Sequence, residues 1–294
     1  MDYPVNLMCL YWTTSGIFPG QAEISRFDFR ERVEAVARAG FKCIGLWHTD
    51  LEHILIHRTL KEMLTILDDN GMQYLELEFL TDWFLEGARK GESDSRKKRL
   101  FEASAVLHAS HVKVGDFYNT LVPMPKLVEA FASLCIEAQH YGASIGFEVM
   151  GCAILDNLPD AITLVESAGA SNGGLIIDIY QVEHQGWSFN QICHIPLKYL
   201  LNVELNDGTL PSDPDDGPSD RKFCGEGQYD IQGLIRCVMG MGYTGSWAVE
   251  VMSEKLAGLP LEELSRLAFD TTMAEFKASG YKVIGNCLDQ IKSD

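Results

Sequence analysis

The chain has 294 residues, of which 46% are hydrophobic, and 24 Lys and Arg against 42 Asp and Glu give it a formal charge of −18. So acidic a chain repels phosphate backbones and anionic membrane surfaces, which argues against nucleic-acid and membrane partners. The sequence has no apolar run of the roughly 20 residues that a membrane-spanning helix needs and no signal-peptide pattern, so we expect a cytoplasmic protein.

Short β-rich runs alternate with longer segments of helical periodicity along the chain. In chain order, the expected strands are residues 5–10, 42–47, 73–79, 111–115, 144–149, 174–179, 199–205 and 246–251. The expected helices are residues 27–40, 51–71, 95–109, 124–142, 157–169, 230–242 and 260–280. Each of these helical segments except 95–109 ends at or beside a glycine, the residue that most often closes a helix.

Eight strands with intervening helices in about 280 residues are typical of a (β/α)8 TIM barrel, which takes about 250 residues. A doubly wound sheet would carry a glycine fingerprint after its first strand, and this chain has none. No linker, shift in composition or internal repeat divides the sequence. We therefore predict one α/β domain, a single TIM barrel over residues 1–294.

The eight cysteines show no CxxC pair and no regular spacing, so we expect reduced, mostly buried thiols and no cysteine-based zinc site. Residues 207–228 form a long stretch rich in Pro, Gly and Asp after the seventh strand. Loops of this length are functional lids or solvated inserts. We expect this loop to fold over bound substrate, with a solvated acidic insert as the alternative.

Alternation along the strands places acidic residues inside the barrel. The apolar residues of the fifth to eighth strands occupy the outward positions, which leaves one carboxylate of each strand pointing inward at or near its end: Glu148, Asp178, Glu204 and Glu250. The active site of such a barrel lies at the C-terminal ends of its strands. These four side chains should therefore meet at one mouth.

Burying four like charges costs many kcal/mol unless a positive charge neutralises them. A divalent cation satisfies this requirement, and an all-oxygen ligand set suits Mg²⁺ or Mn²⁺ better than softer metals. Lys113 also points inward, between Val112 and Val114. It could donate a proton or simply balance the carboxylates.

Other residues follow the strand ends and are candidates for substrate contact. Trp12, Trp47, His48 and Phe117 could stack on a sugar ring, although core packing is an equally good interpretation of aromatic residues there. His184 lies in the loop after the sixth strand and could bind substrate or face solvent. Glu78 shares an inward face with Glu76, and a structural role is favoured for it.

Five short motifs occur in a recognisable order: FEVM with Glu148, IDIYQ with Asp178, VELND with Glu204, RKFCGEGQYD with Arg221, and GSWAVEVMS with Glu250. Together they resemble the xylose isomerase-like TIM-barrel superfamily. That group includes sugar isomerases, ketose 3-epimerases, inosose and 3-dehydroshikimate dehydratases, and endonuclease IV. The resemblance covers essentially the whole barrel.

The resemblance implies that Glu148, Asp178, Glu204 and Glu250 bind a metal ion and that Arg221 grips the substrate. Two positions depart from the family pattern, because Glu204 replaces a histidine ligand and Gln181 replaces a substrate-contacting histidine. The additional carboxylate again favours Mn²⁺ or Mg²⁺ over Zn²⁺.

The implied chemistry is proton abstraction beside a carbonyl, with Glu148 and Glu250 moving protons on opposite faces of the substrate and Lys113 assisting. We therefore expect an isomerase or epimerase acting on a small ketose or related polyhydroxy ketone. A dehydratase acting on a keto-cyclitol or oxidised sugar is the alternative, and a non-catalytic sugar-binding barrel is a third hypothesis. The charge argues against an endonuclease, and the sequence leaves a homo-oligomer open.

Overall fold

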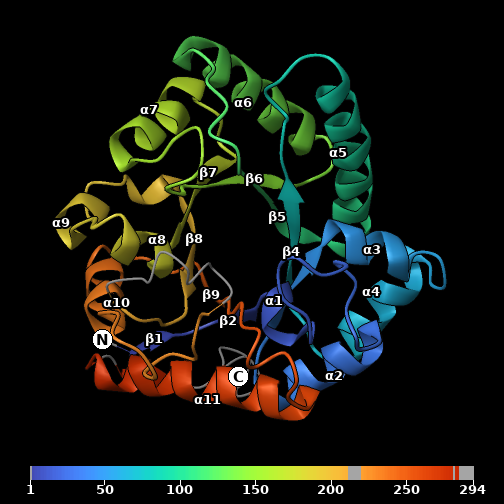
Figure 1. Cartoon of the computed structure of the whole chain (residues 1–294), viewed down its shortest axis with the longest axis vertical. Coiled ribbons are helices and arrows are strands. Elements are labelled where there is room, and N and C mark those ends of the chain that lie inside the picture. Colours follow the sequence, from blue (N-terminus) through green and yellow to red (C-terminus); the bar gives the residue numbers. More distant parts are fainter. Residues whose placement is uncertain (1, 211–219, 281, 285–294) are drawn as a thin grey trace, which may run out of the picture.

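The computed structural model describes residues 2–210, 220–280 and 282–284. Eight parallel strands close into a barrel in chain order, with the last strand pairing with the first (Figure 1). They are β2 (Leu7–Cys9), β3 (Cys43–Trp47), β4 (Tyr74–Leu80), β5 (Ala109–Val114), β6 (Ser144–Glu148), β7 (Gly173–Asp178), β8 (Leu200–Leu205) and β9 (Ser246–Val249). The predicted TIM barrel is confirmed.

Helices surround this barrel on the outside (Figure 1). The longer ones are α2 (Phe29–Ala39), α4 (Leu60–Asp69), α5 (Ala88–Leu107), α6 (Met124–Gln139), α7 (Leu158–Ala168), α10 (Ile231–Gly240) and α11 (Leu261–Ala278). Short helices follow strand ends or lie in the connections: α1 (Tyr11–Thr14), α3 (His48–Ile54), α8 (Ile179–His184), α9 (Phe189–Ile192) and the 3₁₀ turn η1 (Leu197–Tyr199). Outside the barrel, β1 (Asp2–Pro4) pairs in parallel with β10 (Lys282–Ile284).

The expected single helix over residues 51–71 is wrong, because the chain forms α3 and α4 with a break between them. Thr59 begins α4 with a capping box, in which its hydroxyl accepts from the Glu62 N–H and the Glu62 carboxylate accepts from the Thr59 N–H. This reciprocal pair satisfies two N–H groups that a new helix start leaves open. The sequence TLKE carried the signal for the break.

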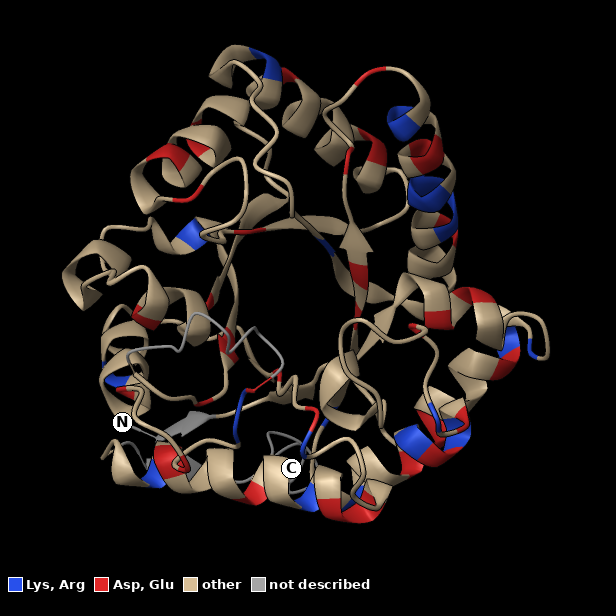
Figure 2. Cartoon of the chain, viewed as in Figure 1, with Lys and Arg blue, Asp and Glu red and all other residues tan. Residues whose placement is uncertain are grey.

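The strands alternate as predicted between an apolar outer face and a polar inner face. Val112, Val114 and Phe147 are buried in the core between strands and helices, whereas Lys113 belongs to the interior of the barrel. A small apolar cluster inside the barrel contains Met8, Leu10, Cys43 and Ala248. Figure 2 shows acidic positions on the barrel strands as well as on the outer helices. Glu76, Glu78, Lys113 and Glu204 are buried on these strands, so the interior of the barrel is charged.

The seven cysteines within the described residues are free thiols, of which Cys9, Cys43, Cys135 and Cys224 are buried. Cys152 and Cys193 are exposed and Cys237 is partly so, while Cys287 lies outside the described residues. Among the described helices, none is long and apolar enough to cross a membrane.

Candidate active site

A cavity of about 590 Å³ opens at the C-terminal ends of the strands. This is the end at which (β/α)8 barrels carry their active sites. One part of its lining is charged: Glu78, Lys113, Glu148, Arg221 and Glu250. We call these five residues the charged floor. A second part, the aromatic wall, consists of Trp12, Trp47, Phe79 and Phe117.

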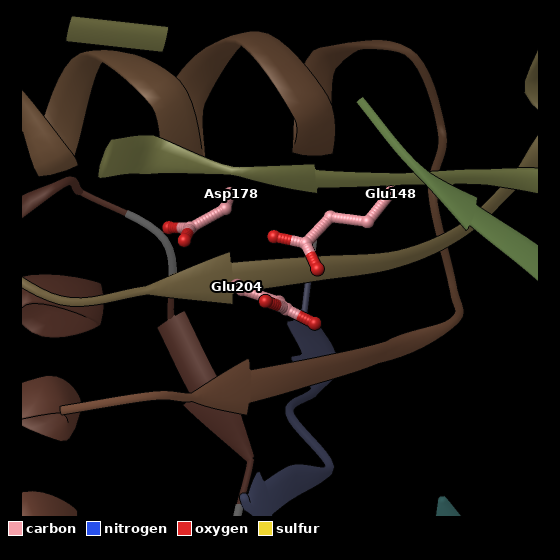
Figure 3. A group of neighbouring side chains, drawn as sticks. All are labelled: Glu148, Asp178 and Glu204. Atoms are coloured by element: carbon pink, nitrogen blue, oxygen red, sulfur yellow. The ribbon is translucent and has the colours of Figure 1, made fainter. Parts of the chain in front are cut away.

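Three of the predicted carboxylates form a compact cluster (Figure 3). Glu148 ends β6, Asp178 ends β7, and Glu204 pairs in register with Asp178 on β8. One oxygen of each lies within 4.8 Å of the others. Glu148 lines the cavity, whereas Asp178 and Glu204 are fully buried.

Glu250, the fourth predicted ligand, follows the end of β9 and is held by two cations instead of joining the cluster. Its Oε1 lies 3.3 Å from Lys113 Nζ, and its Oε2 lies 2.7 Å from Arg221 Nη1. Its role as a metal ligand stays a prediction. In the described structure its carboxylate is neutralised by protein groups.

Lys113 is the charge centre of the barrel. Its Nζ lies 2.7 Å from a Glu204 oxygen, and at most 3.8 Å from the carboxylates of four further residues: Glu76, Glu78, Glu148 and Glu250. Burial lowers the pKa of this ammonium, but the surrounding carboxylates outweigh burial and raise it well above its usual range. Lys113 is therefore a protonated counter-ion in the described structure.

Glu76, His111 and Asn202 form a second polar layer in the barrel interior. Glu76 is predicted from the sequence to point inward, whereas His111 was missed. Glu76 accepts hydrogen bonds from Asn202 Nδ2 at 3.0 Å and pairs with His111 Nε2. Although burial raises its pKa, Lys113 and His111 lower it to about 2. Inward alternation from Lys113 along β5 identifies His111 as an interior residue, so the signal was present in the sequence.

Four other carboxylates of the site have pKa values that are raised, not lowered. Burial raises the pKa of Glu148 to about 8 and that of Glu78 to about 8, and neighbouring carboxylates add to the effect. The pKa of Glu204 is raised well above its usual range for the same reasons, and that of Asp178 is also raised. These groups repel one another and lack sufficient positive charge.

The cluster fits a divalent cation. Glu204 Oε2 is fully buried and has no hydrogen-bond partner, which costs free energy unless another group satisfies it. Six carboxylates meet two cations: Glu76, Glu78, Glu148, Asp178, Glu204 and Glu250 against Lys113 and Arg221. The donor atoms of the cluster are all oxygens, the ligands that hard cations prefer.

Arg221 is buried in the charged floor, and the substrate contact expected of it stays a prediction. Its Nη1 lies 2.9 Å from Asp178 Oδ2 and 2.7 Å from Glu250 Oε2, and its guanidinium stacks over the Tyr180 ring at 4.6 Å. Its backbone N–H donates to Met252 O at 3.0 Å. Ion pairing and backbone contacts with the strand ends hold it in place.

Asp207 organises the end of the expected lid segment. Its carboxylate accepts hydrogen bonds from the N–H groups of Gly225, Gly227 and Tyr229 at 2.8–3.0 Å. The described parts of 207–228 are thus packed against the barrel rather than forming a solvated insert. Residues 211–219 of the predicted loop lie outside the described residues.

The aromatic wall is a stacked series of rings. Phe79 stacks on Phe117 at 4.8 Å and on Trp47 at 6.0 Å, and Trp12 meets Trp47 edge-on at 5.1 Å. Trp47 Nε1 donates to Glu23 Oε2 at 2.7 Å, so its polar atom is satisfied. All four rings line the cavity.

Of three further residues predicted to contact substrate, two line the cavity and one does not. Gln181 and His184 line the cavity, with Gln181 Oε1 accepting from the Gly151 N–H and His184 Nε2 hydrogen-bonding Tyr229 Oη at 2.7 Å. The structure does not bring His48 to the cavity lining. Its Nδ1 accepts from the Phe79 N–H, and burial lowers its pKa to about 3, so it is neutral.

A closed parallel barrel with a carboxylate cluster at its C-terminal mouth defines a (β/α)8 protein with an enzyme-like site. A family model described as xylose isomerase-like TIM barrel matches residues 33–272, and the chain belongs to this family. The resemblance carried by the five motifs is confirmed.

Two curated relatives are a dehydratase and an isomerase. A 3-dehydroshikimate dehydratase of Pseudomonas aeruginosa is 25% identical over 238 residues, which cover 78% of this chain and 37% of the relative. An inosose isomerase of Halalkalibacterium halodurans is 23% identical over 155 residues, which cover 50% of this chain and 52% of the relative. The chain thus spans about two fifths and half of their lengths.

Among solved structures, the IolI protein with a bound zinc atom superposes with a TM-score of 0.82. The two chains are 18% identical, and the match covers 94% of this chain and 99% of IolI. At this identity the likeness establishes the fold.

Proposed function

We propose that this protein is a divalent-metal-dependent isomerase or epimerase of a small polyhydroxy ketone. The observation that carries the proposal is the cluster of Glu148, Asp178 and Glu204 beside the cavity, with a fully buried and unpaired Glu204 oxygen. Such an arrangement has a high cost in stability, and functional sites are where proteins retain such costs.

Glu148, Asp178 and Glu204 would hold the ion, with Glu250 as the predicted fourth ligand. We propose Mn²⁺ or Mg²⁺, because every candidate ligand atom is a carboxylate oxygen. When bound, a divalent cation polarises a substrate carbonyl and lowers the cost of removing the neighbouring proton.

The protein groups around that position are suited to moving protons. Glu148 and Glu250 stand at the ends of β6 and β9, with Asp178 and Glu204 on the two strands between them. One carboxylate can take a proton from one face of the substrate while the other returns a proton to the opposite face. Arg221 Nη1 holds Glu250 Oε2, so the orientation of this carboxylate is fixed.

A dehydratase is the second candidate, because the relative that matches the larger share of this chain is a dehydratase. The same proton abstraction leads to loss of water when a hydroxyl group leaves from the β-carbon instead of a proton returning. The two reactions differ in their products and not in their first step.

Incubation with Mn²⁺ in D₂O, followed by NMR, tests the function. Ketohexoses and inosose are the first probes, and an epimerase should incorporate deuterium at the carbon beside the carbonyl and release the epimer. Loss of water to give an unsaturated ketone, with no proton returned to the carbon beside the carbonyl, identifies the dehydratase. A protein that binds the sugar without exchanging any proton would be the non-catalytic barrel instead.

Direct measurement of metal binding tests the cluster separately. Glu204→Ala should weaken Mn²⁺ binding by about 10- to 100-fold in calorimetric titration, since a ligand is lost. Glu204→His should keep binding and shift the preference toward Zn²⁺ or Co²⁺. Glu86→Gln, at an exposed position, is the matched control. Unchanged Mn²⁺ affinity in Glu204→Ala would show that Glu204 is not a ligand.

A further inference from the structure

We infer that the cavity selects uncharged polyhydroxy ketones and rejects sugar phosphates and keto acids. The inference rests on the proposed function and narrows its substrate class. It follows from the absence of a free cation among the described lining residues, the surplus of negative charge in the floor and the apolar wall opposite.

Binding a phosphate or carboxylate in a closed site requires a cation or several free donors aimed at it. Of the described residues that line the cavity, Lys113 and Arg221 are the lysines and arginines. Lys113 Nζ already faces five carboxylates, and Arg221 Nη1 contacts both Asp178 and Glu250. Both positive charges are engaged by the protein itself.

The histidine of the lining does not supply the missing charge. Burial and the nearby Arg221 guanidinium lower the pKa of His184, so its imidazole is neutral at neutral pH. Its Nε2 is also engaged by the Tyr229 hydroxyl at 2.7 Å. The remaining polar groups, such as the Gln181 amide, suit hydroxyl groups of a neutral substrate.

The charged floor opposes an anion even with a metal in place. Above the pKa of about 8 of Glu78 and Glu148, the six ionised carboxylates around Lys113 and Arg221 outnumber the positive charges by two after a divalent cation is added. An anionic substrate would bring one or two further negative charges into a partly desolvated cavity. Its repulsion by Glu78 and Glu250, which both line the cavity, is weakly screened there.

The aromatic wall supports the same conclusion from the other side. Trp47, Phe79 and Phe117 present stacked rings, which favour the apolar C–H face of a sugar or cyclitol ring and offer nothing to a charged group. Glu23, the lining carboxylate beside this wall, is occupied by Trp47 Nε1 and Thr49 Oγ1. Ring hydroxyls can point to the floor while the C–H face lies on the wall.

Binding to matched neutral and anionic probes, followed by tryptophan fluorescence in the presence of Mn²⁺, tests the inference. The pairs are D-fructose with D-fructose 6-phosphate and inosose with 3-dehydroshikimate. We expect the neutral member of at least one pair to bind about 10- to 100-fold more tightly than its anionic counterpart. Anionic probes that bind as tightly as their neutral counterparts in both pairs, or a lack of binding by both neutral probes, overturn the inference.

A charge-removing variant links the selectivity to the floor. At pH 9, above the pKa of about 8 that burial gives Glu78, Glu78→Gln keeps the shape but removes a negative charge, so the affinity for the anionic probes should rise relative to the neutral ones by about ten-fold. Glu86→Gln, exposed and away from the cavity, should leave the ratio unchanged, and melting curves confirm that both variants are folded. An unchanged ratio in Glu78→Gln contradicts the inference. Because the readout is binding, neutral probes that bind without proton exchange contradict the proposed function alone.

Discussion

The aromatic wall and the charged floor line the same cavity, but burial acts on them in opposite directions. Removing Trp47 and Phe79 from water contributes favourable free energy in proportion to their apolar area. Removing Glu148 and Glu78 from water raises the pKa of each to about 8, which shows that their charged forms are disfavoured there. The wall is stable by itself, whereas the floor depends on its counter-ions.

Burial of the aromatic wall therefore stabilises the fold, whereas the charged floor is retained at a cost in stability for its function. Lys113 and Arg221 offset part of the negative charge, but the three carboxylates of the floor and the three buried beside it exceed what two cations neutralise. A bound divalent cation would relieve the excess. Changes to the floor should therefore affect stability, metal binding and pH response together, while a change to Phe117, the exposed ring of the wall, should affect substrate affinity alone.

The largest effect is expected for Lys113→Met. It leaves five carboxylates without their shared ammonium, and breaking a buried ion pair on one side costs about 3–5 kcal/mol. Urea unfolding in EDTA measures the loss. Lys98→Met, whose ion pair with Glu102 is exposed and 3.9 Å long, is the control and should change little. Equal stability of the two variants would show that Lys113 does not hold the floor together.

The next effect concerns pH in the metal-free protein. The pKa of Glu148 is about 8 in the folded chain against an ordinary 4.5, so its protonated form favours folding. Below pH 4.5 this contribution is fully present, and it is lost as pH rises toward 8, because the unfolded chain then releases a proton that the folded chain retains. Melting temperatures should fall over this range.

Two comparisons sharpen the pH experiment. Glu148→Gln should flatten the slope between pH 5 and pH 8, because the titrating group is gone, and Mn²⁺ should restore the melting temperature at pH 8 by binding the ionised cluster. Glu86→Gln should retain the wild-type slope. A slope that survives in Glu148→Gln and is unaffected by Mn²⁺ would place its origin elsewhere.

Arg221→Ala should have an intermediate effect. Loss of the group that orients Glu250 and faces the cavity should lower kcat/KM by about 10- to 100-fold, the scale of one or two charge-assisted hydrogen bonds. Mn²⁺ should still bind, because removing a cation from the floor removes repulsion. Arg221→Lys should recover part of the activity. Steady-state kinetics at the wild-type value would rule out a role for this guanidinium.

The smallest effect is expected on the aromatic wall. Phe117 is 42% exposed and stacks on Phe79, so Phe117→Leu should leave the melting temperature nearly unchanged while raising KM by about 3- to 10-fold, the scale of one ring contact. Tyr118→Leu changes the neighbouring exposed ring, which lies outside the cavity lining. An equal rise in KM for both variants would mean that ring stacking at Phe117 is not used.

The order of strands and the inward direction of the site residues could be predicted from the sequence. Periodicity is a local property, so two-residue alternation in KCIGLW or HVKVG identifies a strand and places Lys113 inside. The same rule placed Glu148, Asp178, Glu204 and Glu250 at one mouth. The break between α3 and α4 was also encoded locally, in the capping box at Thr59, and was missed because the apolar periodicity continues through it.

The pairing of charges was decided by the tertiary structure alone. Sequence could not show that Lys113 contacts five carboxylates from four other strands, or that Arg221 returns from a long connection to contact Asp178 and Glu250. Such distances depend on the closure of the barrel and on the register of strands far apart in the chain. Alternation determines which face a side chain occupies, while closure determines which charges meet across the interior.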